Sequence, residues 1–180
     1  MPDATAGEPP KSPEPPESPE PREPPESPHI ARVREAAAAR GVELEVARFP
    51  AGTRTAADAA DAIGCELGAI CKSIVLVADD EPVLVLTSGA NRVDETAVGE
   101  VLGAGGVRKA SAAECRQATG SPIGGTAPFG HPEPLRVLLD RDLLAFEVVW
   151  AAAGLPDAVF PIGSAELRRL SGARVADVAA

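Results

Sequence analysis

The sequence contains few aromatic residues: of its 180 residues, four are Phe, one is Trp and none is Tyr. The core of the folded protein must therefore be built mainly from Val, Leu, Ile and Ala. No apolar run approaches the ~20 residues that a membrane-spanning helix needs, and we expect no membrane partner. A chain of this length can bury one core without disulfides or metals, so the expectation is a single domain.

Potential metal ligands and disulfide partners are also scarce. The chain has two histidines and three cysteines, Cys65, Cys71 and Cys115, with neither a ligand spacing nor a CxxC pair. We therefore predict no metal and no cofactor. An odd number of unpaired thiols indicates reduced cysteines in a cytoplasmic protein.

Basic residues are outnumbered, with 17 Lys and Arg against 27 Asp and Glu and a formal net charge of −10. This charge argues against general nucleic-acid coating, against DNA as a partner and against anionic membranes. It leaves room for a small basic pocket, because a local cluster of cations does not need a basic protein.

Residues 1–28 differ in composition from the rest of the chain. They hold eleven of the nineteen prolines and a repeated Glu-Pro-Pro-Glu-Ser-Pro, with almost no apolar side chain. Such a segment cannot bury enough surface to offset the entropy lost on ordering, so we predict a disordered acidic tail. A proline-motif ligand for a protein partner is the alternative. The folded domain is expected to cover residues 29–180.

Helices are predicted where apolar residues recur every three or four positions, and strands where they alternate with polar ones. In the first half of the chain the predicted elements are a helix over 29–40 ended by Gly41, a half-buried strand over 42–47 ending at Phe49-Pro50, a helix from Thr53 or Thr55 to about Ile63, and an antiparallel hairpin of strands over 70–78 and 83–87.

In the second half, the predicted elements are a helix from Asp94 through Leu102, a helix from Ser111 to about Ala118, strands over 135–140, 146–152 and 157–162, and a short helix from Ser164 ended by Gly172. Single and paired strands interspersed with helices fit an α+β domain with a mixed sheet better than a strict βαβ repeat.

The run from Thr119 to Gly130 carries four glycines and two prolines, a composition that excludes helix and interior strand. Gly124, Gly125 and Thr126 would leave backbone N–H groups open to a ligand oxygen, as in an oxyanion hole. Pro122 and Pro128 would limit the movement of this loop. An ordinary surface turn is the alternative interpretation.

Lys72 lies inside an apolar strand, on the same face as Ile70, Ile74 and Leu76 by alternation. A lysine on an apolar face costs free energy unless it has a partner or lines a polar cavity. The alternative is a lysine whose ammonium reaches solvent at the strand end. Ser73 beside it is a possible hydrogen-bond donor.

Several blocks of sequence together resemble the YbaK/EbsC family, stand-alone relatives of the editing domain inserted in prolyl-tRNA synthetases. The blocks are Cys-Lys-Ser-Ile-Val at 71–75, Leu-Thr-Ser-Gly-Ala-Asn-Arg-Val-Asp at 86–94, Gly-Gly-Thr-Ala-Pro-Phe-Gly-His-Pro at 124–132, Ala-Gly-Leu-Pro at 153–156 and Glu-Leu-x-x-Leu at 166–170. The resemblance runs from about residue 30 to residue 180. It implies a single compact α+β domain with a mixed, barrel-like β-sheet flanked by helices.

The resemblance also implies a function: hydrolysis of the ester of a small amino acid wrongly attached to tRNA, here tRNA for proline. The partners would be the acceptor end of mischarged tRNA and an aminoacyl-tRNA synthetase. The alternative is a non-catalytic module of the same fold that binds an aminoacyl end, a nucleotide end or a protein.

Residue roles follow from the same resemblance. Lys72 matches the essential lysine of the family, and Gly124 to Pro128 match the loop whose backbone holds the aminoacyl carbonyl. The catalytic group is expected to be Lys72, Gly124, Gly125 and Thr126, with no nucleophilic side chain. The expected substrate-binding residues are Phe49, Ser73, Gly120, Ser121, Pro128, His131 and Asp140. Arg108 and Lys109 either help to hold the tRNA end or are simply solvated.

Overall fold

The computed structural model of the protein describes residues 26–49 and 55–180. Most of the predicted tail, residues 1–25, and the candidate helix cap Thr53 lie outside the described residues. The first described helix, α1, spans Pro28–Ala38 and is capped by Ser27. It begins one residue before the predicted start, because proline is well suited to the first turn of a helix.

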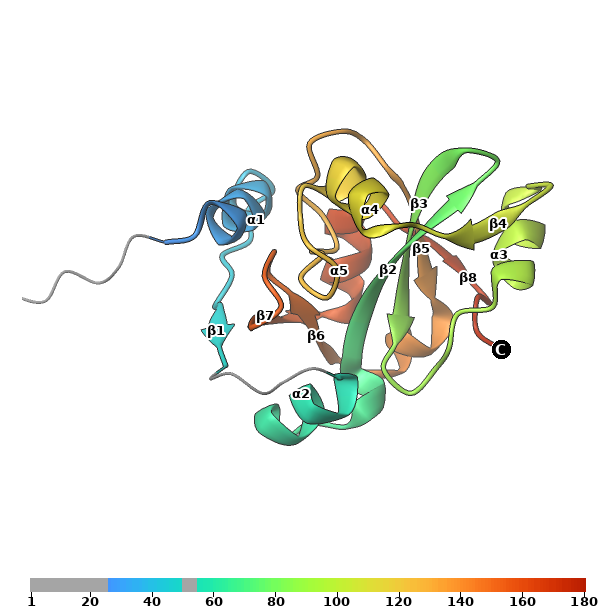
Figure 1. The fold of residues 1–180 in the computed structure, drawn as a ribbon. Helices are drawn as coiled ribbons and strands as arrows, with labels where there is room; N and C mark the ends of the chain where they lie inside the picture. Colours follow the sequence, from blue (N-terminus) through green and yellow to red (C-terminus); the bar gives the residue numbers. More distant parts are fainter. Residues whose placement is uncertain (1–25, 50–54) are drawn as a thin grey trace, which may run out of the picture.

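A mixed eight-stranded sheet forms the centre of the domain (Figure 1). Its order is β1-β7-β6-β2-β3-β5-β8, with β4 pairing β2. The strands are β1 (Ala47–Arg48), β2 (Ile70–Ala78), β3 (Glu81–Ser88), β4 (Val107–Lys109), β5 (Arg136–Asp140), β6 (Val148–Ala152), β7 (Ala158–Gly163) and β8 (Arg174–Ala176). The β2–β6, β3–β5 and β5–β8 pairs are parallel and the other pairs are antiparallel. The predicted α+β class with a mixed sheet is confirmed.

Four further helices follow α1 in the described part of the chain, and short 3₁₀ turns cover 67–69 and 141–145. The helices are α2 (Ala56–Ile63), α3 (Glu95–Leu102), α4 (Ala112–Thr119) and α5 (Ser164–Ser171). The predicted caps Thr55, Asp94 and Ser111 each accept hydrogen bonds from the first turn of their helix. Within the described ranges, no helix is both long enough and apolar enough to cross a bilayer.

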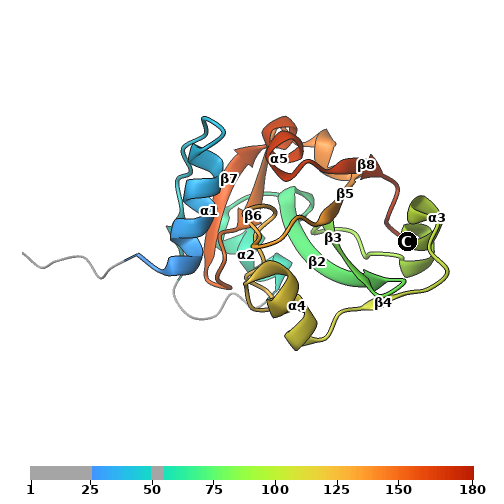
Figure 2. The same cartoon turned by 90° about the horizontal axis from the view of Figure 1, so that it is seen from above.

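The helices cover the sheet on several sides, with α1 lying beside β7 and α3 at the far end near β4 (Figure 2). The larger core cluster joins α1, α5 and one face of the sheet, through side chains such as Val33, Phe160 and Leu167. The smaller cluster joins α3 to the other face, through Leu76, Val85 and Val98. Lys72 shares the second face by alternation, at the margin of this smaller cluster.

One predicted strand is wrong, and two short strands were not predicted. Residues 42–46 have the expected alternation, with Leu44 buried, but only Ala47–Arg48 pair with another strand. The alternation there reflects packing against the core rather than a hydrogen-bonded ladder. β4 and β8 have three residues each, too few for a pattern of alternation to be recognised.

Two strands pair with the same edge of β2 and leave a gap between them. β6 pairs with β2 only at Ile70 and Cys71, and β4 pairs with β2 only from Leu76 to Ala78. Within the described part of the chain, the Lys72–Val75 stretch therefore has no strand beside it on this edge. The glycine-rich loop and Pro156 lie next to this gap and line a cavity there together with β2.

Close backbone packing shapes the glycine-rich loop. Gly125 is buried, and its N–H donates to the Pro122 carbonyl at 3.0 Å. A Cβ at position 125 would lie 2.7 Å from the backbone of Leu155. Because backbone atoms cannot turn away as a side chain can, only glycine fits at this crossing.

We expect Gly125→Ala to destabilise the protein by about 1–3 kcal/mol through this overlap with backbone. The matched control is Gly106→Ala, where a new Cβ would have no heavy atom within 4 Å. That change should be neutral or stabilising by up to about 1 kcal/mol. Urea unfolding of both variants measures the difference, and equal stabilities would contradict the close packing described here.

Candidate functional site

A cavity of about 300 Å³ lies at the gap in the edge of β2. Five consecutive residues of β2, Ile70 to Ile74, line the cavity. The unpaired edge of the strand begins within this stretch, at Lys72. The opposite side comes from the glycine-rich loop, and α2 and β6 supply the rest. The lining residues outside β2 are Phe49, Thr55, Ala56, Ala59, Ile123, Gly124, Thr126, Trp150, Ala152, Pro156 and Val159.

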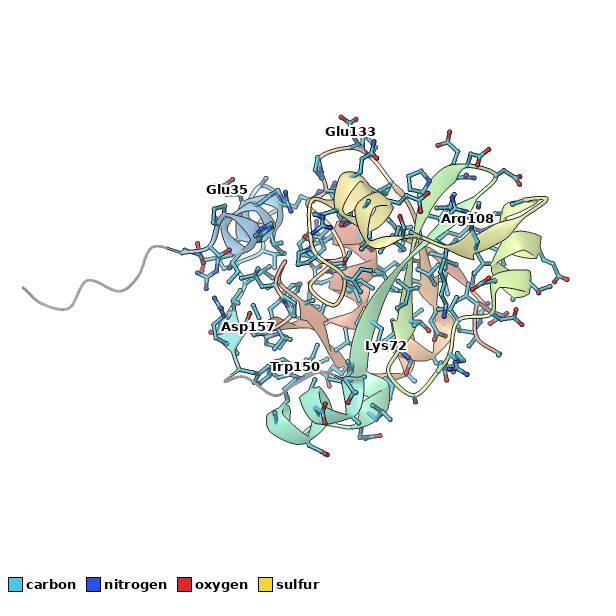
Figure 3. The ribbon with its side chains drawn as sticks, viewed as in Figure 1. Glu35, Lys72, Arg108, Glu133, Trp150 and Asp157 are labelled. Carbon is cyan, nitrogen blue, oxygen red and sulfur yellow. The ribbon has the colours of Figure 1, made fainter. Side chains whose placement is uncertain are left out.

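Five of the predicted site residues meet at this cavity. They are Phe49, Lys72, Ser73, Gly124 and Thr126. Figure 3 shows Lys72 and Trp150 near the end of the sheet that adjoins α2. The lysine from β2 and the loop some fifty positions later in the sequence thus form facing walls of one space.

The Lys72 ammonium is held by the loop that follows β3. Its Nζ donates a hydrogen bond to the Asn91 carbonyl. Burial lowers the pKa of Lys72; the negative charge of Asp140 opposes this shift, and the nearby Arg92 adds to it. Lys72 is therefore a partly buried residue that lines the cavity, and the acceptor of its ammonium among the described residues is the Asn91 carbonyl.

Asp140 does not line the cavity but organises the loop that holds Lys72. Its Oδ2 accepts hydrogen bonds from Thr87 Oγ1, the Ser88 amide and Asn91 Nδ2 at 2.9–3.0 Å, and its Oδ1 accepts from the Asp142 amide at 3.1 Å. Burial alone would raise the pKa of Asp140, but these four hydrogen bonds together lower it. The carboxylate is therefore ionised and fully bonded.

Two residues of the glycine-rich loop that line the cavity, Gly124 and Thr126, have unbonded amides within the described part of the chain. Among the described residues, the N–H groups of Gly124 and Thr126 have no hydrogen-bond acceptor. Gly124 has φ +85°, a conformation that favours glycine. Gly125, by contrast, does not line the cavity, and its amide is used within the loop.

Two other predicted residues, Gly120 and Ser121, lie where α4 ends rather than at the cavity. Arg32 of α1 holds them: its Nη2 donates to the carbonyls of Thr119 and Gly120 at 3.3 and 3.1 Å, and to Ser121 Oγ at 3.3 Å. A side chain at position 120 would collide with this guanidinium, since its Cβ would lie 2.5 Å from Arg32 Nη1. The contacts of Gly120 and Ser121 with Arg32 therefore fix the start of the glycine-rich loop.

Pro128 and His131 also lie outside the cavity. Pro128 is buried in the loop. His131 lines a different hollow, next to α1 and α5, where its Nε2–H donates to the Ala127 carbonyl at 2.8 Å. Burial lowers the pKa of His131, although the hydrogen bond to Ala127 partly opposes this shift. The His131 ring therefore contacts the glycine-rich loop outside the cavity.

No activated nucleophile lines the cavity within the described part of the chain. Burial raises the pKa of Cys71 to about 12, so its thiol is protonated at neutral pH. Ser73 Oγ is buried without a hydrogen-bond partner among the described residues, so no base activates it. Nor do three His, Cys, Asp or Glu side chains gather into a metal-binding group within 26–49 and 55–180.

Asn91, Trp150 and Arg32 were missed as contributors to the site. Trp150 is the only tryptophan of the chain, which was a usable signal, and it pairs with Ile70 at the start of the gap. Asn91 belongs to the 86–94 block, but its role depends on contacts with Lys72 and Asp140 that sequence spacing does not reveal.

Comparisons with known proteins agree with this fold and cavity. The family model of the aminoacyl-tRNA editing domain matches residues 50–170. The chain therefore belongs to the aminoacyl-tRNA editing domain family, and the predicted relationship to YbaK/EbsC proteins is confirmed.

Individual relatives support the same assignment. A crystal structure of a candidate trans-editing enzyme for prolyl-tRNA synthetase superposes with a TM-score of 0.82 at 44% identity, covering 87% of this chain and 99% of that one. The uncharacterized protein YwhH of Bacillus subtilis is 30% identical over 134 residues, 74% of this chain and 85% of YwhH.

A proline–tRNA ligase of Lactobacillus helveticus is 35% identical over 91 residues. These residues are 51% of this chain but only 16% of the ligase, so the similarity is confined to one part of a much larger enzyme.

We expect Asp140→Asn to lower the free energy of unfolding by about 2–3 kcal/mol at neutral pH. The amide would replace one accepting oxygen by an NH₂ group, which would face hydrogen-bond donors instead of acceptors. Asp177→Asn is the control: its carboxylate pairs with Arg141 on the exposed surface, so its loss should be much smaller. Denaturant unfolding checks both, and an equal small loss would show that the Asp140 network is not stabilising.

The same carboxylate predicts a pH dependence of stability. A group whose pKa is lowered by folding stabilises the protein above its ordinary pKa, and this contribution disappears as the pH falls through the lower folded value. The stability difference between wild type and Asp140→Asn should therefore be largest near neutral pH and shrink in acid. A difference that stays constant from pH 7 to pH 3 would contradict an ionised, stabilised carboxylate.

Proposed function

We propose that this protein is a trans-editing hydrolase that cleaves the ester of a small amino acid mischarged on tRNA, specifically tRNA for proline. Water is the nucleophile. Lys72 and the backbone amides of the loop from Gly124 to Pro128 bind and polarise the ester. Membership of the aminoacyl-tRNA editing family supports this class of reaction.

The observation that carries the proposal is the pairing of an ammonium with open amides across one cavity. Ester hydrolysis passes through a tetrahedral intermediate whose oxygen becomes negative. The N–H groups of Gly124 and Thr126, without an acceptor among the described residues, are donors of the kind that stabilise such an oxygen. The Lys72 ammonium adds positive charge in a partly buried site, where it acts more strongly than in water.

Water is favoured as the nucleophile because the side chains of the described cavity offer no activated alternative. The Cys71 thiol is protonated, and the Ser73 hydroxyl has no base beside it. Thr126 Oγ1 already contacts Pro122 O at 3.4 Å and Cys115 Sγ at 3.5 Å. An amino-acid ester is reactive enough that positioning and charge stabilisation alone can accelerate its hydrolysis.

The dimensions of the cavity favour a small amino acid. A volume of about 300 Å³ is at the lower end of the range for ligand sites. Trp150, Pro156 and Val159 make the wall largely apolar. Relatives that are proline–tRNA ligases, or that are named as trans-editing enzymes for prolyl-tRNA synthetase, suggest that the mischarged substrate is tRNA for proline. Such a synthetase is the expected partner.

Deacylation of tRNA for proline carrying alanine, serine, threonine or cysteine tests this function. Lys72→Ala should lower the rate on the preferred substrate by about 10²–10³-fold, the loss seen when one group that stabilises an oxyanion is removed. Arg108→Gln is the charge-matched control, because Arg108 is exposed and paired with Glu114 away from the cavity.

Equal rates for wild type and Lys72→Ala, both above spontaneous hydrolysis, would remove Lys72 from the mechanism. Tight binding of the aminoacyl-tRNA without any turnover by wild type would replace the hydrolase with a binding module of the same fold.

A further inference from the structure

A second hollow, of about 580 Å³, adjoins the first at Lys72. Lys72 and Ile74 line both, because they stand on the unpaired stretch of β2 that separates the two spaces. The remaining walls of this second hollow come from β3, β4, the loop into α3, the start of α3 and the segment after β8. They are Thr87, Arg92, Val93, Asp94, Glu95, Lys109 and Ala180.

The strand register places two lysines on the same face of the sheet. Lys72 and Leu76 share a face by alternation, and Lys109 of β4 pairs directly with Leu76. Side chains that pair across antiparallel strands lie on the same side of the sheet. The two lysines therefore project over one surface about four residues apart along β2, a separation of about 13 Å at the base.

The second hollow contains cations without a partner. Neither Arg92 nor Lys109 forms an ion pair or a side-chain hydrogen bond with any residue in the described ranges. Arg92 also acts unfavourably on the charge of Lys72. Arg108, the neighbour of Lys109, differs: it lies outside this hollow and donates to Glu114 at 2.8 and 3.0 Å.

Two acidic residues along the hollow, Asp94 and Glu95, form no ion pair with these cations among the described residues. The Asp94 carboxylate accepts from the Thr96 and Ala97 amides at 2.8 and 3.3 Å, so it serves as the cap of α3. Glu95 lies in the first turn of that helix and forms no ion pair with a described residue. An anion that entered the hollow would relieve the repulsion between Lys72 and Arg92.

We propose that this second hollow binds the backbone phosphates of the single-stranded 3′ end of the tRNA, immediately upstream of the ribose that carries the ester. Lys72 then stands at the junction, with the ester on one side and the phosphates on the other, while Arg92 and Lys109 contact phosphate oxygens. The identity of the RNA rests on the proposed function, whereas phosphate binding by Arg92 and Lys109 does not.

A chain of phosphates fits the hollow better than a single ion. The cations come from three separate segments, β2, the loop into α3 and β4, rather than from one point. Arginine and lysine are the usual partners of phosphate groups. A local contact of this kind also suits a protein of net charge −10, which would repel the body of the RNA. Affinity should therefore be modest and sensitive to salt.

Binding of the trinucleotide CpCpA, compared with adenosine, tests the phosphate site without any hydrolysis. We expect wild type to bind CpCpA more tightly than adenosine, with affinity for CpCpA falling as salt rises. Arg92→Gln and Lys109→Gln should each weaken CpCpA binding by about three- to tenfold and reduce the slope of log affinity against log salt by about 0.7. Adenosine binding should not change.

Arg108→Gln is the matched control, with the same change in charge one residue from Lys109 but outside the hollow. It should bind CpCpA like wild type. Equal losses in all three variants, or equal binding of CpCpA and adenosine by wild type, would overturn the proposal. Displacement of CpCpA by inorganic phosphate at equal concentration would also overturn it, since that result describes a site for free phosphate.

Deacylation then separates this inference from the proposed function. Arg92→Gln and Lys109→Gln should slow hydrolysis of aminoacyl-tRNA at low substrate concentration, with little change at saturation, and should not affect an aminoacyl-adenosine that lacks the phosphates. If wild type hydrolyses neither substrate but CpCpA binding behaves as expected, the hydrolase is wrong and the phosphate site stands. If hydrolysis is normal in both variants on tRNA, the phosphate site is wrong and the hydrolase stands.

Discussion

The candidate site depends on an interruption in the pairing of one strand. β6 leaves β2 after Cys71, and β4 joins it only at Leu76, so an inner strand of the sheet has a short free edge. A free edge in the middle of a sheet would normally be filled, because unpaired backbone groups are costly when buried. Here the glycine-rich loop and Pro156 approach it without adding a strand, and a cavity remains.

The position of Lys72 in this gap is fixed by a hydrogen-bond network centred on Asp140. Asp140 accepts four hydrogen bonds: from Thr87 and Ser88 at the end of β3, from Asn91 in the loop that follows, and from the Asp142 amide. The Asn91 carbonyl in turn accepts a hydrogen bond from the Lys72 ammonium. The carboxylate thus acts on the lysine through a loop rather than through a direct ion pair. A direct pair would occupy the N–H groups of the ammonium, whereas here its acceptor among the described residues is the Asn91 carbonyl and the remaining N–H groups are available to a ligand.

The sequence predicted the helices, the β2–β3 hairpin and most strands, because these elements have clear periodicity and strong capping residues. It also predicted that Lys72 and the glycine-rich loop belong to one site. The different structural roles of neighbouring glycines could not be predicted from the sequence. Gly124 lines the cavity, Gly125 allows the close approach of the Leu155 backbone, and Gly120 allows the close approach of the Arg32 guanidinium. Composition shows that a glycine is needed, but only tertiary packing shows why.

The burial of Cys71 affects how the protein responds to oxidants. Its thiol touches the candidate site yet is buried, and it stays protonated because burial disfavours the thiolate. Peroxides and alkylating agents react with thiolates, so this cysteine is a poor target for them. The proposed hydrolysis would therefore continue under oxidative stress that inactivates enzymes with a thiolate nucleophile.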